Sequence, residues 1–308
     1  MIDKLEFLIA LARERNFSRA AEGCGVTQPT LSAGIKQLED TLGVLLVNRS
    51  SRFYGLTAEG ERVLEWARRI VSDARTMRQD VQASKTTLTG HLTLAAVPTA
   101  LPMAAELTAP FQIKHPGVRF TILSCTSREI IAMLDDFQID AGLTYLDNEP
   151  LGQLNKVPIY RERYSLLTCA GNPLADRTEV TWSDVSRIPL CLLTPDMQNR
   201  RIVDRLLATS AAPPPVESNS MVVLFSHVRL GRYACIIPEK LAQLLGASEP
   251  LRAIPIGAPR ELHTIGLVSP LREPIPPLTK ALVEEAARLT GRAKPGLRTA
   301  LIDRLVNP

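Results

Sequence analysis

The chain has 308 residues, of which 45% are hydrophobic and 22% are charged. This composition is typical of a folded globular protein and excludes a disordered or fibrous chain, while the length corresponds to about two domains. The formal net charge is only +4, which excludes a protein uniformly coated with positive charge. Five scattered cysteines without C-x-x-C spacing indicate a reducing, cytoplasmic environment. We expect neither a signal peptide nor a membrane span, because the sequence has no cleavage site and no apolar run of about 18 residues.

Residues 17–42 have the pattern of two short helices joined by a tight turn. Ser18 can cap the first helix, Gly23 ends it, and Thr27 caps a second helix with Pro29 in its first turn. One apolar face of the second helix is formed by Leu31, Ile35, Leu38 and Leu42. This arrangement predicts a helix-turn-helix, whose second helix enters the major groove of DNA. The residues expected to contact DNA from this helix are Thr27, Gln28, Pro29, Thr30, Ser32 and Lys36.

A basic tip between two short strands is expected after this motif. Residues 44–47 and 53–56 are short apolar runs, and the polar segment between them contains Arg49 and Arg52. Such a hairpin is typical of a wing, whose arginines would contact phosphates or a minor groove. The alternative is a small helical subdomain with an exposed polar face that binds no DNA.

A long helix is predicted over residues 58–88, capped by Thr57. Residues 61–88 contain neither glycine nor proline, and a helix over 58–88 would be about 46 Å long. Its apolar residues alternate spacings of four and three, which is typical of a seam that packs against a second helix. The dimerisation residues expected on this seam are Val63, Ala67, Ile70, Ala74, Met77, Val81 and Leu88. The alternative is that the helix packs only against its own chain.

Residues 91–308 are rich in turns, since Pro29 is the only proline before them. Apolar, β-branched runs of strand length occur at 91–97, 119–125, 139–145, 164–170, 188–194, 233–238 and 263–269. Helical stretches lie at 103–115, 127–136, 198–209, 219–230 and 277–290. This alternation predicts an α/β region with parallel sheets, and its size favours two lobes.

A ligand site is expected where the strands of such a fold end, close to helix N-termini. Hydroxyl and free N–H groups there suit an anion such as a carboxylate. The candidate effector-binding residues are Thr99, Ala100, Thr126, Ser127, Thr144, Thr194 and Phe225. The alternative is that Thr99 and Ser127 only cap helices. The four histidines have no metal-ligand spacing, so we expect no metal and no cofactor. The cysteines within strand runs are interpreted as structural thiols rather than a redox switch.

The N-terminal residues resemble the LysR-type transcriptional regulators. The matching runs are FSRAAEGCGVTQPTLSAGIKQLEDTLGVLLVNR (17–49) and LTAEG (56–60). The resemblance implies an N-terminal winged helix-turn-helix, a long linker helix that dimerises, and a two-lobed α/β effector domain similar to periplasmic binding proteins. The implied domain bounds are 1–57, 58–90 and 91–308, with lobe I at about 91–161 and 265–295 and lobe II at about 162–264.

This sequence departs from the family pattern at two positions. Ala33 stands where many members carry a basic residue, so one DNA contact of the family is absent here. Val47 stands where most members have phenylalanine. The phrases VPTALP (97–102) and ESNSMVVLFSHVRLGRYACIIP (217–238) resemble a subgroup of these regulators found beside formate dehydrogenase operons. That resemblance implies a regulator of C1 or carboxylate metabolism.

The function predicted from these features is sequence-specific DNA binding controlled by a small-molecule effector. The expected partners are double-stranded promoter DNA and a second copy of the chain, with no membrane. The resemblance further implies a homotetramer, RNA polymerase as a partner, and an effector that changes the bending of promoter DNA. The alternatives are a cytosolic small-molecule-binding protein and an enzyme on an α/β scaffold. An enzyme is disfavoured because no G-x-S-x-G, P-loop or G-x-G-x-x-G pattern occurs.

Overall fold

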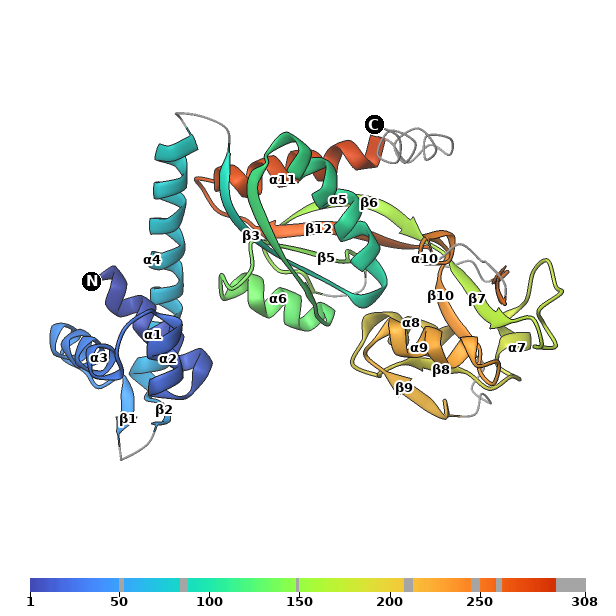
Figure 1. The fold of residues 1–308 in the computed structure, drawn as a ribbon, viewed down its shortest axis with the longest axis horizontal. Helices are drawn as coiled ribbons and strands as arrows, with labels where there is room; N and C mark the ends of the chain where they lie inside the picture. The colour runs from blue at the N-terminus through green and yellow to red at the C-terminus, as the bar shows by residue number, and fades with distance from the viewer. Residues whose placement is uncertain are drawn as a thin grey trace. The chain divides into compact units, whose positions relative to one another are not determined.

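The computed structural model of the chain describes residues 1–49, 53–83, 88–147, 150–207, 213–244, 250–258 and 262–291. It contains two compact units, one built mainly from Met1–Leu88 and the other mainly from the chain that follows. Figure 1 shows the helical first unit and the α/β second unit. Within the described part of the chain, no helix is long and apolar enough to cross a membrane.

The first unit begins with three short helices. They are α1 (Ile2–Glu14), α2 (Phe17–Gly23) and α3 (Gln28–Leu42). Asn16 caps α2, because its side chain accepts a hydrogen bond from the Arg19 amide at 3.0 Å; the prediction of Ser18 as the cap is wrong. Thr27 caps α3 as predicted, and its side chain accepts from the Thr30 amide at 3.4 Å.

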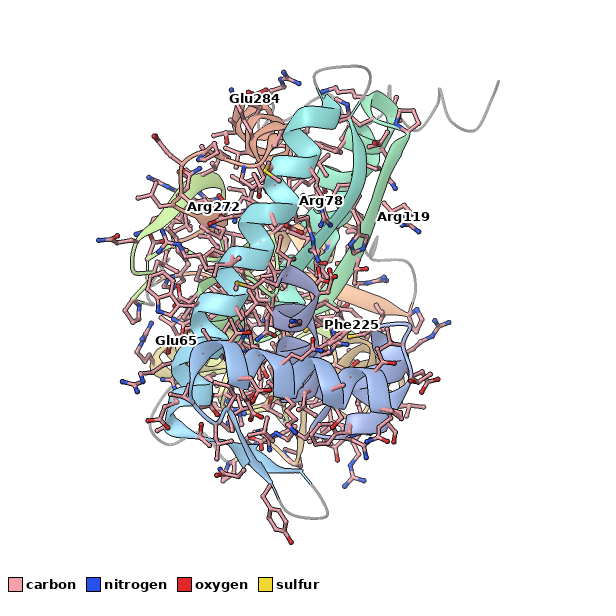
Figure 2. The ribbon with its side chains drawn as sticks, turned by 90° about the vertical axis from the view of Figure 1, so that its left-hand side faces the viewer. Glu65, Arg78, Arg119, Phe225, Arg272 and Glu284 are labelled. Atoms are coloured by element: carbon pink, nitrogen blue, oxygen red, sulfur yellow. The ribbon has the colours of Figure 1, made fainter. Side chains whose placement is uncertain are left out.

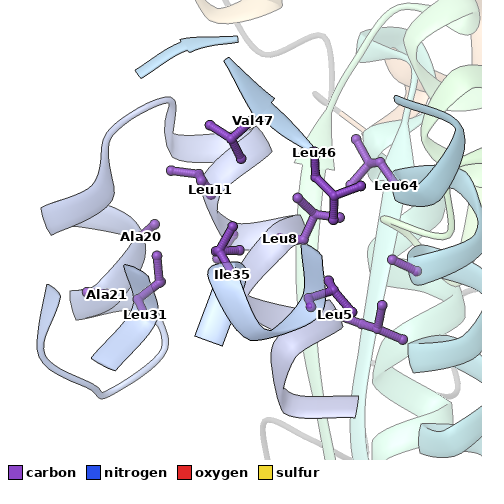
Figure 3. Packing of buried hydrophobic residues seen from close by; sticks show 13 residues of the cluster. Leu5, Leu8, Leu11, Ala20, Ala21, Leu31, Ile35, Leu46, Val47 and Leu64 are labelled. Carbon is purple, nitrogen blue, oxygen red and sulfur yellow. The ribbon is translucent and has the colours of Figure 1, made fainter. Parts of the chain in front are cut away.

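The core of the first unit lies between α1, α3 and the start of α4 (Ala58–Ala83), as Figure 3 shows. Leu31 and Ile35 of α3 are fully buried in this core, as is Leu8 of α1. Leu42, predicted on the same apolar face, is exposed because α3 ends there and Gly43 turns the chain away with φ of 70°.

A two-stranded wing follows α3. Strand β1 (Val47–Arg49) pairs antiparallel with β2 (Phe53–Leu56). The first strand therefore begins at residue 47 and not at 44, because residues 44–46 form the turn out of α3. The buried Glu39 carboxylate of α3 holds this turn by accepting hydrogen bonds from the Leu46 and Val47 amides at 2.9 and 3.2 Å.

The helix α4 starts against the wing. Thr57 caps it, with its hydroxyl accepting from the Gly60 amide at 2.9 Å and donating to the Leu45 carbonyl at 2.6 Å. A Cβ atom at Gly60 would lie 2.1 Å from the Leu46 carbonyl oxygen, so only glycine fits this approach. Residues 84–87 lie outside the described residues, and Leu88 is not helical. The prediction of a helix through residue 88 is therefore wrong at its end.

A five-stranded sheet forms the first lobe of the second unit. Its order is β4-β3-β5-β12-β6, with β3 (Thr89–Ala96), β4 (Gly117–Ser124), β5 (Ala141–Tyr145), β6 (Leu154–Glu162) and β12 (His263–Pro270). Strands β3, β4 and β5 are parallel. Strand β12 runs antiparallel to both of its neighbours, so the expectation of wholly parallel sheets is wrong. The helices of this lobe are α5 (Leu101–Lys114), α6 (Ser127–Asp135) and α11 (Pro277–Gly291), with a 3-10 turn η1 at Pro98–Ala100.

Strand β6 was not expected from the sequence. It carries Pro158, which donates no backbone hydrogen bond, and proline is tolerated in a sheet mainly at an edge. The structure places β6 at the edge of the sheet, where partly and fully exposed residues interrupt the buried ones, in contrast to the continuous apolar run of a central strand.

The second lobe has a three-stranded sheet, β10-β7-β11, beside the pair β8-β9. Its strands are β7 (Tyr164–Cys169), β8 (Cys191–Leu193), β9 (Val216–Ser218), β10 (Cys235–Pro238) and β11 (Leu251–Pro255). Its helices are α7 (Trp182–Val185), α8 (Gln198–Leu206), α9 (Met221–Arg229) and α10 (Glu239–Leu244). The short β9 and β11 were not predicted, since neither has an apolar run of strand length. Residues 292–308, whose role the sequence left open, lie outside the described residues.

Candidate DNA-binding surface and effector site

The N-terminal part of α3 presents the residues predicted to read DNA. Thr27, Gln28, Pro29, Thr30 and Lys36 are exposed, and Ser32 is half-buried. The hydroxyl groups of Thr27 and Thr30 lie 2.9 Å apart and pair with each other. Thr30 therefore offers mainly its methyl group to a partner, while the Gln28 amide can make two hydrogen bonds to one base.

The wing contains a basic and an aromatic residue. Arg49 is the last residue of β1, and Arg52 lies outside the described residues. Tyr54 of β2 is 73% exposed, although an aromatic ring of this size is usually covered. Sequence reasoning did not select Tyr54; its signal is an aromatic residue next to the basic tip of a hairpin.

The predicted seam of α4 divides into two sets. Ala67 is fully buried in the core of its own chain, and Val63 packs against the same core with Leu64. By contrast, Ile70 and Met77 are exposed. The part of the seam at Ala67 therefore cannot face a second chain, because α1 already covers it.

A third exposed apolar side chain on α4 is that of Trp66. It is 63% exposed and stands four residues before Ile70, on the same helical face as Met77. Ala74 is half-buried, and the side chain of Val81 lies outside the described residues. Charged side chains such as Glu65 and Arg78 stand elsewhere along α4 (Figure 2).

Five strand ends bring buried polar residues to one edge of the five-stranded sheet. Strands β3, β4 and β5 are parallel and therefore end at the same edge. Thr99 follows β3 there, Ser127 follows β4, and Tyr145 is the last residue of β5. The antiparallel β12 starts at this edge with His263, which pairs in register with Glu162 at the end of β6. All five residues are buried. We refer to these five residues as the strand-end cluster.

Tyr145 connects the strand-end cluster to the second lobe. Its hydroxyl donates to Glu162 Oε2 at 2.6 Å and lies 3.4 Å from Thr99 Oγ1. The Nδ2 atom of Asn199, near the start of α8, reaches the same hydroxyl at 3.5 Å. Tyr164, the first residue of β7, lies 3.4 Å from Glu162 Oε2 through its own hydroxyl. Residues from both lobes thus meet at one phenol.

Burial strongly perturbs the ionisable groups of this cluster. It raises the pKa of Glu162 to about 7, although hydrogen bonds from Tyr145 and Tyr164 act in the opposite direction. Burial, and then the charge of Glu162, raise the pKa of Tyr145 and of Tyr164 well above the usual value. Both phenols therefore remain protonated hydrogen-bond donors near neutral pH.

The structure separates helix caps from free hydroxyl groups at the strand ends. Thr126 caps α6, because its hydroxyl accepts from the Glu129 amide at 3.1 Å while the Glu129 carboxylate accepts from the Thr126 amide at 2.8 Å. Thr99 makes no capping hydrogen bond in η1, and Ala100 is the residue that precedes α5. The buried hydroxyl groups of Ser127 and Thr144 have no partner among the described residues.

The two remaining effector candidates belong to the second lobe. Thr194 follows β8, and its buried hydroxyl also has no partner in the described part of the chain. Phe225 (labelled in Figure 2) packs partly against the core of this lobe, next to Leu224 of α9. Sequence reasoning did not select Tyr145, Glu162 or Asn199; the available signal was a lone acid between two tyrosines, Tyr160 and Tyr164, at a strand end.

The five cysteines are free thiols. Cys191 and Cys235 are buried in the second lobe, and burial raises the pKa of Cys24 and Cys125. Among the described residues, no cluster of histidine, cysteine or acidic side chains could hold a metal ion.

Two family models match the chain. A model described as the bacterial regulatory helix-turn-helix protein of the lysR family matches residues 2–61, and one described as the LysR substrate binding domain matches residues 85–290. The DNA-binding transcriptional dual regulator OxyR of Escherichia coli K12 is 27% identical over 307 residues, covering 97% of this chain and 99% of that protein. A hydrogen peroxide-inducible genes activator of Pectobacterium carotovorum is 27% identical over 278 residues, with 88% and 92% covered.

Two solved structures are also similar to the chain. A full-length OxyR variant from Pseudomonas aeruginosa superimposes with a TM-score of 0.75 at 26% identity, covering 93% of this chain and 94% of that one. Full-length CbnR complexed with its target DNA shares the fold, with a TM-score of 0.65 at 21% identity and coverage of 94% and 99%.

Proposed function

Because the chain belongs to the LysR family of bacterial regulatory helix-turn-helix proteins, we propose that it binds a palindromic promoter site as a dimer or tetramer and that a small carboxylate changes this binding. The chain is a DNA-binding transcription regulator with a small-molecule-binding domain, and it is not an enzyme. The observation that carries the proposal is the exposed N-terminal part of α3, held in a winged helix-turn-helix.

The proposed DNA reading uses three kinds of contact. The Gln28 amide pairs with adenine, the Thr30 methyl group packs on a thymine methyl group, and Lys36 binds guanine or a phosphate. Thr27, Pro29 and Ser32 line the same end of α3. The wing arginines Arg49 and Arg52 contact the backbone or a minor groove.

Binding of the full chain to its own promoter region and to scrambled DNA of equal length tests this function. Gln28→Ala should reduce the preference for the promoter by about tenfold or more, because one bidentate base contact contributes about 1–3 kcal/mol. Arg49→Ala should weaken both affinities similarly and reduce the salt dependence by about one phosphate contact.

The matched control for this experiment is Gln37→Ala, an exposed glutamine half a turn out of phase with Gln28 on the same helix. It should leave the preference unchanged. Equal and salt-sensitive affinity of the wild-type chain for promoter and scrambled DNA would contradict specific recognition.

We propose that self-association uses the exposed apolar face of α4. This face consists of Trp66, Ile70 and Met77, with Ala74 at its margin. It differs from the predicted seam because it includes Trp66 and leaves out the residues that pack in the core of the same chain. Exposed apolar residues on one side of a long helix favour a partner helix, because burying them removes apolar surface from water. A dimer of this kind would present two α3 helices to the two half-sites of a palindrome.

The carboxylate is proposed to bind at the strand ends. Ser127 supports this site, since its buried hydroxyl is unpartnered and stands at the N-terminal end of α6, where helix N–H groups favour an anion. Thr144 and Thr194 offer further unpartnered hydroxyl groups, whereas the Thr99 hydroxyl is engaged with Tyr145. Thr126 uses its hydroxyl as a cap and donates its amide to the Glu129 carboxylate, so neither group is open to an anion in this structure.

Thermal unfolding of the full chain with formate, acetate, propionate and succinate tests the effector site. A ligand of the folded state raises the melting temperature in proportion to its affinity. Ser127→Ala should weaken binding of the most effective carboxylate by about tenfold, since a hydrogen bond to a charged group contributes about 1.5–3 kcal/mol. Ser183→Ala, an exposed serine of the same unit, is the control. Unchanged binding to Ser127→Ala would contradict the proposed site.

We further propose RNA polymerase as a partner and the cytoplasm as the location. Five unpaired cysteines support the second point, because free thiols are typical of a reducing compartment. Control of C1 or carboxylate metabolism is supported only by the sequence resemblance to regulators found beside formate dehydrogenase operons.

A further inference from the structure

Glu162 is a buried acid that the proposed carboxylate site does not use. Its side chain is 1% exposed, and its Oε1 atom has no hydrogen-bond partner among the described residues. Only Oε2 is engaged, by the hydroxyl groups of Tyr145 and Tyr164. A buried carboxyl oxygen without a partner is costly in a folded protein, and such a group calls for a functional explanation.

The direction of the hydrogen bonds around Tyr145 makes this end of the cluster rich in acceptors. Tyr145 has one hydroxyl proton, and it donates that proton to Glu162 at 2.6 Å. Thr99 and Asn199 must then donate to the Tyr145 oxygen, which leaves the lone pairs of Thr99 available. A ligand group that reaches Thr99 Oγ1, or Oε1 of ionised Glu162, therefore has to donate a hydrogen bond.

The groups that face Glu162 come from each strand around it. Tyr145 belongs to β5, Tyr164 to β7 and His263 to β12, where the histidine ring lies 6.4 Å from each of these two phenol rings. Tyr160, on the strand of Glu162 itself, interacts with its charge.

Two cations on neighbouring elements are engaged with other acids. Arg200 of α8 pairs with Asp204 and Glu217, and Lys240 of α10 pairs with Glu106. A cation or donor for Oε1 can thus be supplied by a bound molecule.

We propose that the effector donates a hydrogen bond to Glu162, so that it is a small carboxylate carrying a second, donating group, either a hydroxyl or an amine. This inference rests on the proposed carboxylate site at Ser127. Strands β4 and β3, which precede Ser127 and Thr99, are neighbours, and Tyr145 reaches from beside Thr99 to Glu162.

The pH dependence of binding distinguishes the two donating groups. An ammonium group pairs with ionised Glu162, so its affinity should rise as the pH increases through neutrality and the proton leaves the carboxyl group. A hydroxyl group carries no charge and donates to either form, so its affinity should change much less with pH.

Calorimetric titration of the full chain with matched acids tests the inference. The probes are propionate, lactate and alanine, and succinate, malate and aspartate, in which a hydroxyl or amine is added to the same carbon chain. At least one substituted acid should bind about tenfold more tightly than its unsubstituted partner. Glu162→Gln should abolish this ratio and leave the affinity for the unsubstituted acid within about threefold of wild type.

The matched control is Glu273→Gln, an exposed glutamate of the same unit, which should keep the ratio. A single cooperative thermal unfolding transition of the effector-binding unit shows that Glu162→Gln is folded; if it is not, Tyr145→Phe, which removes the phenol that holds Glu162, should lower the ratio in its place. Two results would overturn this inference but leave the proposed carboxylate site standing. One is equal affinity for substituted and unsubstituted acids, and the other is a preference for substituted acids that survives in Glu162→Gln. If no acid binds, the proposed carboxylate effector is contradicted together with it.

Discussion

Two buried carboxylates have opposite roles in this molecule. Glu39 accepts hydrogen bonds from two backbone amides of the turn before the wing, so it is satisfied within its own chain. Glu162 has one satisfied oxygen and one unpartnered oxygen, and burial raises its pKa to about 7. The first residue therefore supports the fold, whereas the second has capacity for a further partner.

The titration of Glu162 should make stability depend on pH. The folded chain holds the proton of this carboxyl group up to a pKa of about 7, against a usual value of 4.5. Folding is thus most favoured when both states are protonated, below about pH 4.5. The contribution of Glu162 to the free energy of unfolding declines as the pH rises from about 4.5 to about 7, and it is constant above that pH. The total decline is roughly 3 kcal/mol.

Urea unfolding of the full chain at a series of pH values measures this contribution. Glu162→Gln should remove the decline between pH 4.5 and 7, because glutamine does not titrate. Glu273→Gln is the control and should retain it. A Glu162→Gln variant with the same pH profile as the wild type would show that Glu162 is not the titrating group.

At the scale of elements, α4 belongs to two packing environments. Its first part completes the core of the first unit through Leu64 and Ala67, while Trp66, Ile70 and Met77 remain uncovered. Some apolar residues of α4 therefore pack within their own chain, and the others form a surface that a second copy of the chain can cover. Gly60 fixes the start of the helix against the wing.

Replacing Gly60 should destabilise the contact between α4 and the wing. In Gly60→Ala the added Cβ would lie 2.1 Å from the Leu46 carbonyl oxygen, so backbone must move. We expect a loss of about 1–3 kcal/mol, as for other overpacked sites. Thermal unfolding checks this, with Gly171→Ala as the control because a Cβ there meets no atom within 4 Å. Equal melting temperatures of the two variants would contradict the close approach.

Charging the exposed face of α4 should weaken self-association. Ile70→Glu places a carboxylate among Trp66 and Met77, where a partner helix would have to bury it, and an unpaired buried charge is strongly unfavourable. Sedimentation analysis should show a shift from dimer or tetramer towards monomer. Arg75→Glu adds a carboxylate on a different face of the same helix and should leave the assembly intact. An unchanged assembly in Ile70→Glu would exclude this face from the interface.

At the scale of the whole molecule, charge does not separate the DNA-binding part from the rest. Residues 1–90 and 91–308 each have a net charge of +2. If the proposed contacts hold, DNA affinity depends on where Lys36 and the wing arginines stand, and on how many copies of the chain bind together. This supports a regulator that recognises a specific site through an oligomer, rather than a basic domain that coats DNA.

Hydrogen peroxide should not alter promoter binding, although several relatives are named as hydrogen peroxide-inducible genes activators. The thiolate is the reactive form, and burial raises the pKa of Cys24 and Cys125. A hydrogen bond with Cys235 lowers the pKa of Cys191, but both residues are buried. Fluorescence anisotropy with promoter DNA before and after peroxide treatment checks this. A loss of affinity that dithiothreitol reverses and that Cys191→Ser abolishes would contradict the expectation.

Helix caps and apolar patterns in the sequence were sufficient to predict the helix α3 and most of the buried strands. The cap at Thr27, the proline in the first turn of α3 and the apolar face at Leu31 and Ile35 predicted this helix, and the structure has it. Most strands of the α/β region were predicted for the same reason, since continuous apolar runs mark buried strands. The edge strand β6 was missed because Pro158 and exposed residues interrupt its run.

Only the tertiary structure decided which residues meet. Thr99, Tyr145, Glu162 and Asn199 are far apart in the sequence, and strand order and direction bring them to one phenol. The antiparallel course of β12 is invisible in its composition, because strand composition does not encode the direction of a neighbour. The sequence by itself determined a winged helix-turn-helix, a long helix and an α/β region. Packing alone decided which half of the α4 seam is covered by its own chain and that a buried acid stands where the strands end.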